Sequence, residues 1–221
     1  EDALSRDFSV NALYYDIKSK EIIDYVNGYE DCKNNLLRTI GDTYTRFRED
    51  PVRMLRALRF KSALDMEVDT AIEQNMNILH NDIVLCSTAR LLEEILKILR
   101  KGNALRGFQE MTRYQFCNKL IPQLQHFYAE MHTEYLVLLE RCLYAADTLF
   151  LEGKKVYDMP LICSLFYPVY LFYLSEAEKR GGNLDRGELA SFILYHYAGY
   201  LHLTKRMTEK LKQILILLHY F

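Results

Sequence analysis

The first fifty residues contain two short apolar stretches that are rich in β-branched and aromatic side chains. These stretches, Val10 to Tyr15 and Glu21 to Val26, have the composition typical of β-strands. The polar residues 16–20 between them suit the turn of a β-hairpin. Gly28 and Gly41 then mark a segment rich in loops. The pattern predicts a small β unit at the start of the chain.

From about Asp50 onward the apolar positions recur with the period of an α-helix. Asp50 suits an N-cap and Pro51 the first helical position, so a helix is predicted to begin there. Its apolar side chains lie on one face, and arginines spaced three residues apart lie on another. Further helices are predicted over Thr70 to Leu79, Ser87 to Leu99, Glu134 to Leu151, Pro160 to Leu174, Glu188 to Leu203 and Thr204 to His219. The predicted fold class is mainly α.

The predicted hairpin needs more sheet than this sequence supplies. Two strands alone form a unit of marginal stability, so we expect a strand partner upstream of residue 1. The sequence also begins at Glu1 rather than at a methionine. The expectation is therefore that the chain is a fragment of a longer protein.

The composition is that of a soluble globular protein. Of the 221 residues, 50% are hydrophobic and 26% are charged, which excludes a disordered or fibrous chain. The formal net charge of −2 gives no overall attraction for nucleic acid. Any contact with RNA must therefore come from local basic patches.

The cysteines and the most apolar run exclude two further classes. The five cysteines are widely spaced and form no Cys-x-x-Cys pair, so they predict free thiols in a reducing cytoplasm rather than disulfides or a zinc site. The run from Met159 to Leu174 is too short to span a bilayer comfortably and contains Pro160 and Pro168. We expect a buried helix, kinked or broken at Pro168, and no membrane contact.

Four motifs occur in order along the first 120 residues. Residues 6–12 read Arg-Asp-Phe-Ser-Val-Asn-Ala and resemble the Arg-Arg-Asp-Phe-Thr-x-Asn-Ala motif of class II nucleotidyltransferases. Residues 24–31, Asp-Tyr-Val-Asn-Gly-Tyr-Glu-Asp, are similar to the flexible Asp-x-x-x-Gly connector of that family. Residues 49–60 begin Glu-Asp-Pro-Val-Arg and resemble its nucleotide-reading Glu-Asp-x-x-Arg motif, and residues 89–94 resemble its Arg-x-x-x-Glu helix. The chain thus resembles the bacterial poly(A) polymerase and CCA-adding enzyme family.

The resemblance implies an organisation in three parts. Residues 1–45 correspond to the C-terminal remnant of the nucleotidyltransferase head, and residues 46–120 to a helical neck that reads the nucleotide and binds RNA. Residues 121–221 correspond to a helical body or tail. The family holds its catalytic metals on an Asp-x-Asp pair, and this sequence contains none. No metal ligand is therefore predicted here, and the metal-binding part of the head is expected to precede Glu1.

Asp7 is, by the same resemblance, an active-site carboxylate. Arg6 and Asn11 are expected to contact the sugar or the phosphates of a nucleotide. An edge strand with a surface ion pair, Arg6 with Asp7 or Asp2, is the structural alternative. The sequence departs from the family at Ser5, where the first of two paired arginines is usual. One cation fewer would then face the triphosphate.

Asp50 and Arg53 have the chemistry to select a base. A carboxylate can accept a hydrogen bond from an exocyclic amine while a guanidinium donates to ring nitrogens. Spacing of three on one helix turn places both on one side, and Arg56 extends the same face. We expect all three to contact the nucleotide. In the alternative interpretation, Asp50 only caps the helix and Arg53 is a solvated cation.

Glu49, Arg90 and Glu94 are expected to support that helix without touching the nucleotide. Arg90 and Glu94 lie four residues apart and are predicted to form an ion pair on their own helix. A purely helix-stabilising pair is the alternative.

A basic cluster follows, and it could track an RNA backbone. Charge runs are usually solvated faces, so a contact with RNA and a simple surface are both open. Tyr114 or Phe116 could stack on a base beside it. The four cations expected to contact RNA are Lys97, Arg100, Lys101 and Arg106.

The implied reaction of the intact protein is the addition of AMP from ATP to an RNA 3′ end, with Mg²⁺ and release of pyrophosphate. The poly(A) polymerase branch is favoured by residues 11–15, Asn-Ala-Leu-Tyr-Tyr, and by residues 89–94. A CCA-adding enzyme is the first alternative, and a non-catalytic helical RNA-binding protein is the second. The fragment alone is expected to be inactive yet to retain affinity for a nucleotide or RNA. The sequence does not determine the oligomeric state.

Overall fold

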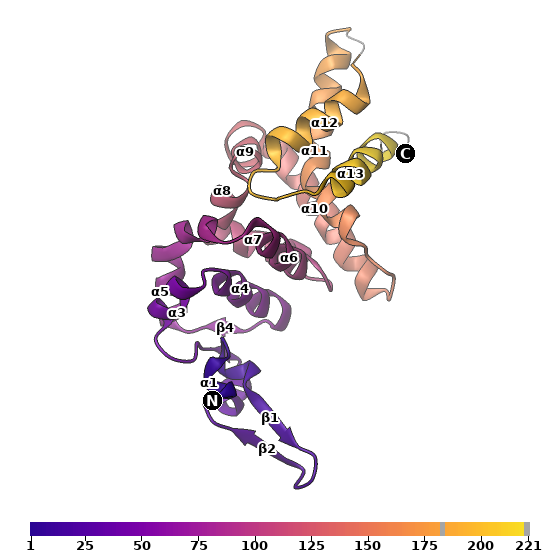
Figure 1. Ribbon diagram of the computed structural model, residues 1–221. Helices are drawn as coiled ribbons and strands as arrows, with labels where there is room; N and C mark the ends of the chain where they lie inside the picture. Colours follow the sequence, from indigo (N-terminus) through magenta and orange to yellow (C-terminus); the bar gives the residue numbers. More distant parts are fainter. Residues whose placement is uncertain (182–183, 219–221) are drawn as a thin grey trace.

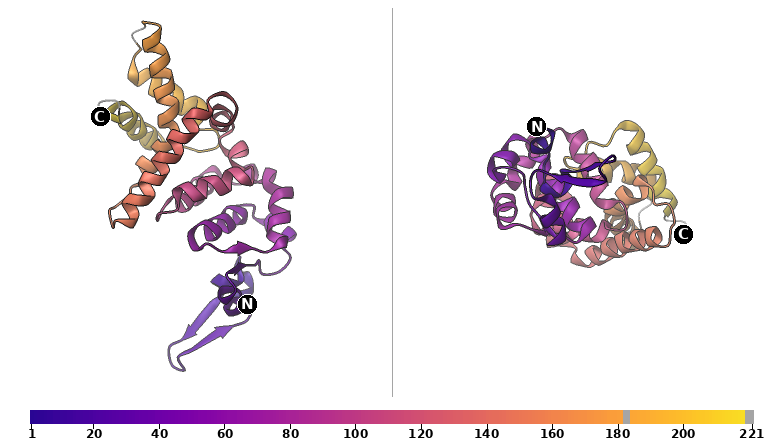
Figure 2. Two further views of the ribbon diagram at one scale, coloured as in Figure 1. Left: turned by 180° about the vertical axis from the view of Figure 1, so that it is seen from behind. Right: turned by 90° about the horizontal axis from the view of Figure 1, so that it is seen from below.

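The computed structural model describes residues 1–181 and 184–218. The molecule is elongated, with a hairpin at one end and stacked helices beyond it (Figures 1 and 2). We call residues 1–42 the N-terminal segment, residues 43–113 the middle helices and residues 116–218 the C-terminal helices. Helices dominate and the strands are few and short, so the predicted mainly α fold is confirmed.

The N-terminal segment contains the predicted hairpin. After the short helix α1 (Asp2–Ser5), strands β1 (Leu13–Asp16) and β2 (Glu21–Asp24) pair in antiparallel fashion. The turn predicted at residues 16–20 is found at residues 17–20, because Asp16 still belongs to β1. The first strand begins later than predicted because Ser9–Asn11 form a turn of 3-10 helix.

A tight connection follows the hairpin. The Asp24 carboxylate accepts backbone N–H bonds of 2.9–3.1 Å from Val26, which precedes α2 (Gly28–Lys33), and from Gly28 and Tyr29 at its start. A Cβ on Gly28 would lie 2.2 Å from the carbonyl oxygen of Ser9, so only glycine fits there. The first part of the segment predicted as a loop is thus a short helix packed against the 3-10 turn.

A buried carboxylate holds the N-terminal segment together, and a short parallel strand pair joins it to the middle helices. Asp31 is 4% exposed and accepts hydrogen bonds from Ser9 and from Arg38, the latter at 2.9 Å. Strand β3 (Leu36–Leu37) then pairs in parallel with β4 (Glu67–Val68). These contacts fix the segment that carries Asp7 relative to the helices that follow.

The middle helices form two layers around a buried apolar core. Asp42 caps the first of them through the N–H of Thr45 at 2.8 Å, and Asp69 caps the third through Ile72 at 2.8 Å. Met54 is fully buried on the second. The five are α3 (Thr43–Glu49), α4 (Val52–Leu64), α5 (Thr70–Leu79), α6 (Thr88–Leu99) and α7 (Ala104–Arg113).

The predicted cap by Asp50 is wrong. Asp50 ends α3 in an extended conformation, and Pro51 is the N-cap of α4, which has no side-chain cap. The carboxylate of Asp50 is engaged elsewhere. Helices α3 and α7 were not predicted; α3 has few apolar positions, whereas the apolar residues of α7 do recur with helical spacing and were missed.

The C-terminal helices pack around aromatic side chains. The ring centroids of Phe127 and Phe172 lie 5.4 Å apart, and those of His132 and Phe172 lie 4.0 Å apart. The π turn Phe127–Met131 precedes the longest helices. These helices are α8 (Phe116–Leu120), α9 (Pro122–His126), α10 (Thr133–Leu151), α11 (Asp158–Lys179), α12 (Arg186–Tyr197) and α13 (Lys205–Leu218).

Helix α11 is longer than predicted and continues through Pro168, so a break there is wrong, while the alternative of a kink stays a prediction. Its length and composition alone would allow it to cross a membrane. Half of its most apolar window is buried against the protein, as in the core helix of a globular fold. The predicted end of the last helix, His219, lies outside the described residues.

Candidate functional site

Asp7 lies on a short extended segment that pairs with residues 38–40. Its carbonyl accepts from Ile40 N–H at 3.2 Å, and Ser9 N–H donates to Arg38 at 3.0 Å. The side chain of Phe8 is fully buried beneath the segment. The backbone around Asp7 is therefore fixed, and its carboxylate faces the middle helices.

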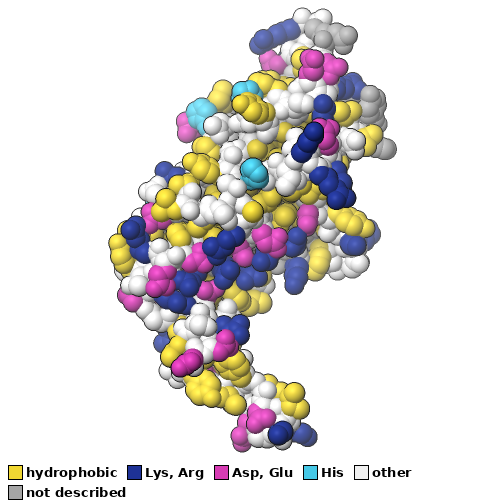
Figure 3. Space-filling model, viewed as in Figure 1, with side chains coloured by type: hydrophobic (Ala, Val, Ile, Leu, Met, Phe, Trp, Pro, Cys, Tyr) yellow, Lys and Arg dark blue, Asp and Glu magenta, His cyan; other side chains and the backbone are white. Residues whose placement is uncertain are grey.

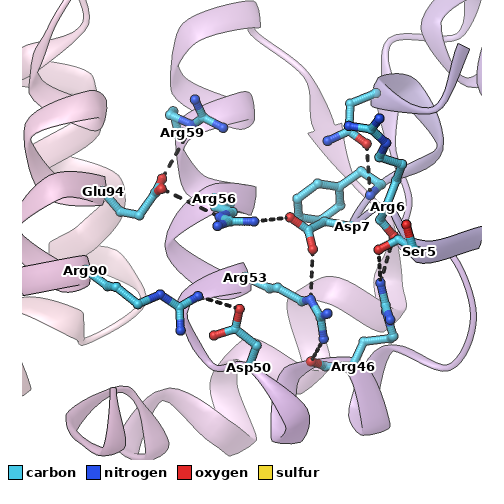
Figure 4. A network of polar contacts seen from close by, with 12 residues as sticks. Ser5, Arg6, Asp7, Arg46, Asp50, Arg53, Arg56, Arg59, Arg90 and Glu94 are labelled. Carbon is cyan, nitrogen blue, oxygen red and sulfur yellow. Dashed lines mark hydrogen bonds and ion pairs between the residues drawn. The ribbon is translucent and has the colours of Figure 1, made fainter. Parts of the chain in front are cut away.

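Two arginines of α4 hold the Asp7 carboxylate, as Figure 4 shows. Arg53 Nε donates to Oδ1 at 2.8 Å, and Arg56 Nη1 donates to Oδ2 at 2.5 Å. The two arginines reach it together because residues three apart lie on one helix face. The Asp7 side chain is only 13% exposed. Burial alone would raise the pKa of Asp7, but the hydrogen bonds from Arg56 and Arg53 outweigh it and hold the pKa below its usual value.

Arg53 also connects α3 to the Asp7 carboxylate. Its Nη1 donates to the carbonyl of Arg46 at 2.7 Å and lies 3.2 Å from Glu49 Oε2. Arg46 in turn donates to the carbonyls of Ser5 and Arg6, at 3.0 and 2.8 Å. Glu49 thus contacts Arg53 of α4, and its supporting role stays a prediction. Arg46 joins the same network, although the sequence did not indicate it.

Asp50 lies beside this pair and is held by α6. Arg90 Nη2 donates to Asp50 Oδ2 at 2.7 Å, across forty residues of sequence. Figure 4 shows Asp50 and Arg53 next to each other, with Asp7 on the far side of Arg53. The structure therefore brings Asp7, Arg53 and Asp50 to one place, as their predicted shared role requires.

The ion pair predicted between Arg90 and Glu94 is wrong. Arg90 donates to Asp50, and Glu94, one turn further along the same side of α6, faces Arg56 and Arg59 of α4 instead. Glu94 is 4% exposed and lies 3.6 Å from Arg56 and 3.8 Å from Arg59, while Lys97 donates to it at 3.0 Å. The buried carboxylate of Glu94 thus links α6 to two arginines of α4 and helps to hold their side chains in place.

Arg6 and Asn11 lie away from the Asp7 carboxylate. Arg6 donates to Asp2 at 2.9 Å and is half exposed, which is the alternative ion pair considered above. Asn11 is exposed, and its side-chain oxygen accepts from the N–H of Phe8 at 3.3 Å. Their contact with a nucleotide stays a prediction.

No group of three or more metal-ligating side chains comes together among residues 1–181 and 184–218. Both oxygens of Asp7 are engaged by guanidinium groups. The described residues alone therefore do not form a magnesium site, and no chemical step is assigned to a metal held by them.

The four predicted RNA-contacting cations differ in their surroundings. Arg100 forms two hydrogen bonds of 2.8 Å with Asp158, and Arg106 pairs with Asp65 on the surface. Lys97 pairs with Glu94, whereas Lys101 is exposed and forms no ion pair among the described residues. Figure 3 shows basic and acidic side chains interleaved across the middle helices.

The two aromatic residues proposed to stack on a base are unsuitable for that role. Tyr114 is 2% exposed and Phe116 is 0% exposed, so both belong to the core. Burial is also the main cause that raises the pKa of Tyr114 to about 12. Aromatic residues at helical spacing more often belong to the core than to a surface on which a base stacks, and the sequence did not distinguish the two.

Two family models match the chain in the order of the motifs. Residues 1–38 match the poly(A) polymerase head domain, and residues 65–128 match a probable RNA- and SrmB-binding site of polymerase A. Poly(A) polymerase I of Haemophilus influenzae is 34% identical over 199 residues, which are 90% of this chain and 43% of that protein.

The chain belongs to the bacterial poly(A) polymerase and CCA-adding enzyme family. A CCA-adding enzyme of Staphylococcus aureus (strain Newman) is also 35% identical, over 57% of this chain and 31% of that protein. The chain spans less than half the length of these curated relatives.

A solved structure shares its fold with the whole length of the chain. This structure, described as a tRNA-processing enzyme (apo form 2), superposes with a TM-score of 0.66 at 24% identity. The alignment covers 100% of this chain and 57% of that one. The C-terminal helices, which the motifs do not reach, are thus included in the shared fold.

Proposed function

We propose that this chain forms the nucleotide-reading part of an enzyme that adds AMP from ATP to RNA 3′ ends without a template. The observation that carries the proposal is the meeting of Asp7, Arg53 and Asp50 at one point, from segments more than forty residues apart. In an unrelated helical protein, nothing would require Asp7 of the first motif to lie beside Asp50 and Arg53 of the third. Family membership supports the same conclusion.

The geometry suits selection of adenine. Asp50 is fixed by Arg90 through one carboxylate oxygen, and its other oxygen can accept from the exocyclic amine of adenine. Arg53 lies one helical turn away and can donate to a ring nitrogen. Arg56 brings a further cation toward the phosphates. Burial alone would lower the pKa of Arg56, but the hydrogen bond that it donates to Asp7 and the nearby carboxylates outweigh burial and raise it. A protein surface can therefore choose the base where no template strand exists.

The cations of this face also suit the charge of the substrate. Nucleotidyl transfer builds negative charge on the triphosphate, and preorganised donors stabilise it. We propose ATP and Mg²⁺ as the substrate and cofactor of the intact enzyme, with the RNA 3′ end as acceptor. We further place the protein in the cytoplasm, where its cysteines, all free in the structure, would stay reduced.

Incorporation assays on the full-length protein test the reaction. Radiolabelled ATP or CTP is offered with a generic RNA oligonucleotide and with tRNA that lacks its 3′ CCA. We expect AMP to be added repeatedly to the oligonucleotide, and CTP to be a poor substrate on both acceptors. Addition of CMP to the tRNA would instead identify a CCA-adding enzyme.

The CCA-adding alternative has one specific observation in its favour, the 35% identity to the S. aureus enzyme. That similarity covers 57% of this chain, whereas the similarity to poly(A) polymerase I covers 90%. The greater coverage supports the poly(A) polymerase branch.

A further inference from the structure

The peptide groups on both sides of Asp7 are held by neighbouring elements. The carbonyl of Arg6, which is bonded directly to the nitrogen of Asp7, accepts from Arg46 Nη2 at 2.8 Å. The carbonyl of Asp7 itself accepts from the N–H of Ile40 at 3.2 Å. Each residue has only two soft backbone dihedrals, so fixing both peptide groups sets the direction in which the Asp7 side chain leaves the backbone. We call residues 5–9 the Asp7 segment.

Arg46 reaches this backbone from α3, as Figure 4 shows. The same Nη2 also donates to the carbonyl of Ser5 at 3.0 Å. Ser5 is the last residue of α1, and Arg6 leaves that helix in an extended conformation with a ψ of 159°. Carbonyls at a helix end have no partner within the helix, and an arginine side chain is a suitable donor to them. Arg46 therefore fixes the start of the Asp7 segment against α3.

The main chain of Arg46 contacts the other two residues of the site. Its carbonyl accepts from Arg53 Nη1 at 2.7 Å and from the N–H of Asp50 at 3.3 Å. Arg53 in turn donates to the Asp7 carboxylate at 2.8 Å. One residue of α3 is thus hydrogen-bonded to the backbone beside Asp7, to Arg53 and to Asp50. The contacts form a closed chain, which runs from Arg46 through the Asp7 segment and Arg53 back to Arg46.

The position of Arg46 is unfavourable for stability alone. Its side chain is 18% exposed, and its one carboxylate contact among residues 1–181 and 184–218 is with Glu49 at 3.6 Å, which is longer than a hydrogen bond. Its Nε atom is buried and forms no hydrogen bond within the same residues. A cation in such a place loses hydration that neutral carbonyls replace only in part. The burial of this charge therefore indicates a functional role.

We propose that Arg46 is a positioning residue for adenylyl transfer, which holds the Asp7 segment against α3 so that the Asp7 carboxylate meets the arginines of α4. Arg46 acts through Asp7 and does not itself contact the nucleotide. This assignment rests on the function proposed above and adds to it a residue that the motifs did not name. A displacement of about 1 Å can cost a reaction about 100-fold in rate, so loss of this anchor should be visible in kcat.

The test combines kinetics with amide hydrogen exchange in the full-length protein that carries Arg46→Gln. Glutamine is too short to reach both carbonyls, while the main-chain bonds of residue 46 remain. We expect kcat for AMP incorporation to fall by about ten- to a hundredfold, with the KM for RNA unchanged. Without substrate, the amide of Ile40 should exchange faster than in the wild type, because the Asp7 carbonyl to which it donates is held less firmly.

A double-variant cycle separates positioning from general stabilisation. If Arg46 acts through Asp7, adding Arg46→Gln to Asp7→Asn should lower kcat by no more than about a further factor of two. An equal loss of kcat in the wild-type and Asp7→Asn backgrounds would overturn the proposal. Arg46→Lys keeps a cation of similar reach and should retain more of kcat than Arg46→Gln, and it guards against misfolding of the latter.

Arg48 provides the matched control on the same helix. It lies two residues from Arg46 and pairs with Asp82 at 2.9 Å, outside the site, so Arg48→Gln should leave kcat and the exchange of Ile40 unchanged. Unchanged kcat and unchanged exchange with Arg46→Gln would refute the assignment. Because exchange is measured without turnover, failure of the anchor is distinguishable from failure of the proposed function, which would appear as absence of AMP transfer by the wild type.

Discussion

The middle helices and the C-terminal helices are held together by different kinds of contact. In the middle helices, ion pairs join elements far apart in sequence, as Arg53 and Arg56 do with Asp7, and Arg90 with Asp50. In the C-terminal helices the partners are rings, with Phe127 and Phe172 at the centre of an aromatic cluster. Half-buried ion pairs are costly to desolvate and add little net stability. Their concentration in one region therefore indicates a site for charged ligands, whereas the aromatic region serves as a scaffold.

The largest expected effect tests the scaffold. Phe127 is 2% exposed, and Phe127→Ala should lower the free energy of unfolding by about 3–5 kcal/mol through the cavity it leaves. Chemical denaturation measures this loss. The KM for ATP of the molecules that remain folded should not change. Phe192→Ala, which removes an exposed ring, is the matched control and should lower the free energy of unfolding only slightly. A rise in the KM for ATP with Phe127→Ala would show that the aromatic region is not only a scaffold.

The next effect tests the charged site. Asp7→Asn keeps the shape of the side chain but removes the charge that faces Arg53 and Arg56. We expect kcat for AMP incorporation to fall by about 10²–10³-fold or more, as for other groups that act on transition-state charge. The circular dichroism spectrum should be retained. The same conservative change at Asp82, which pairs with Arg48 at 2.9 Å outside the site, should leave kcat unchanged.

A smaller effect tests whether Arg90 positions Asp50. Arg90→Ala removes a hydrogen bond of 2.7 Å from a half-exposed arginine, so the loss should be about 1 kcal/mol, or a factor of about five. We expect this as a rise in the KM for ATP, with the KM for RNA unchanged. Arg90→Lys should restore part of the affinity, since it keeps the charge but not the planar fork. Equal changes in both KM values would mean that Arg90 only stabilises the fold.

The smallest effect concerns pH. The folded-state pKa of Asp7 is lowered, so its charge contributes stability above its unfolded pKa of about 3.9, and that stability is lost as the pH falls through the folded value. The free energy of unfolding, measured at several acidic pH values, should become the same for wild type and Asp7→Asn below about pH 4. If the difference in free energy of unfolding between the two proteins stays constant down to the lowest pH, the ionised carboxylate of Asp7 does not contribute to stability.

Much of the helical framework follows from local pattern. The predicted bounds of Thr70 to Leu79 match α5, and those of Glu134 to Leu151 differ from α10 by one residue. Periodic apolar positions determine such helices because each turn must bury the same face. Helix α7 was missed although Ala104, Leu105, Phe108 and Met111 recur with helical spacing. The break predicted at Pro168 failed because the surrounding helices hold α11 together through the proline.

The sequence by itself determined which residues gather: the order of the motifs named Asp7, Asp50 and Arg53, and the structure brings them to one place. Only the tertiary structure decided how they pair. Arg90 lies four residues from Glu94 yet bonds to Asp50, and the Asp50 expected to cap its own helix accepts that bond instead. An arginine side chain is long and can reach several carboxylates, so spacing along one helix does not choose among them. The packing of α6 against α4 makes that choice.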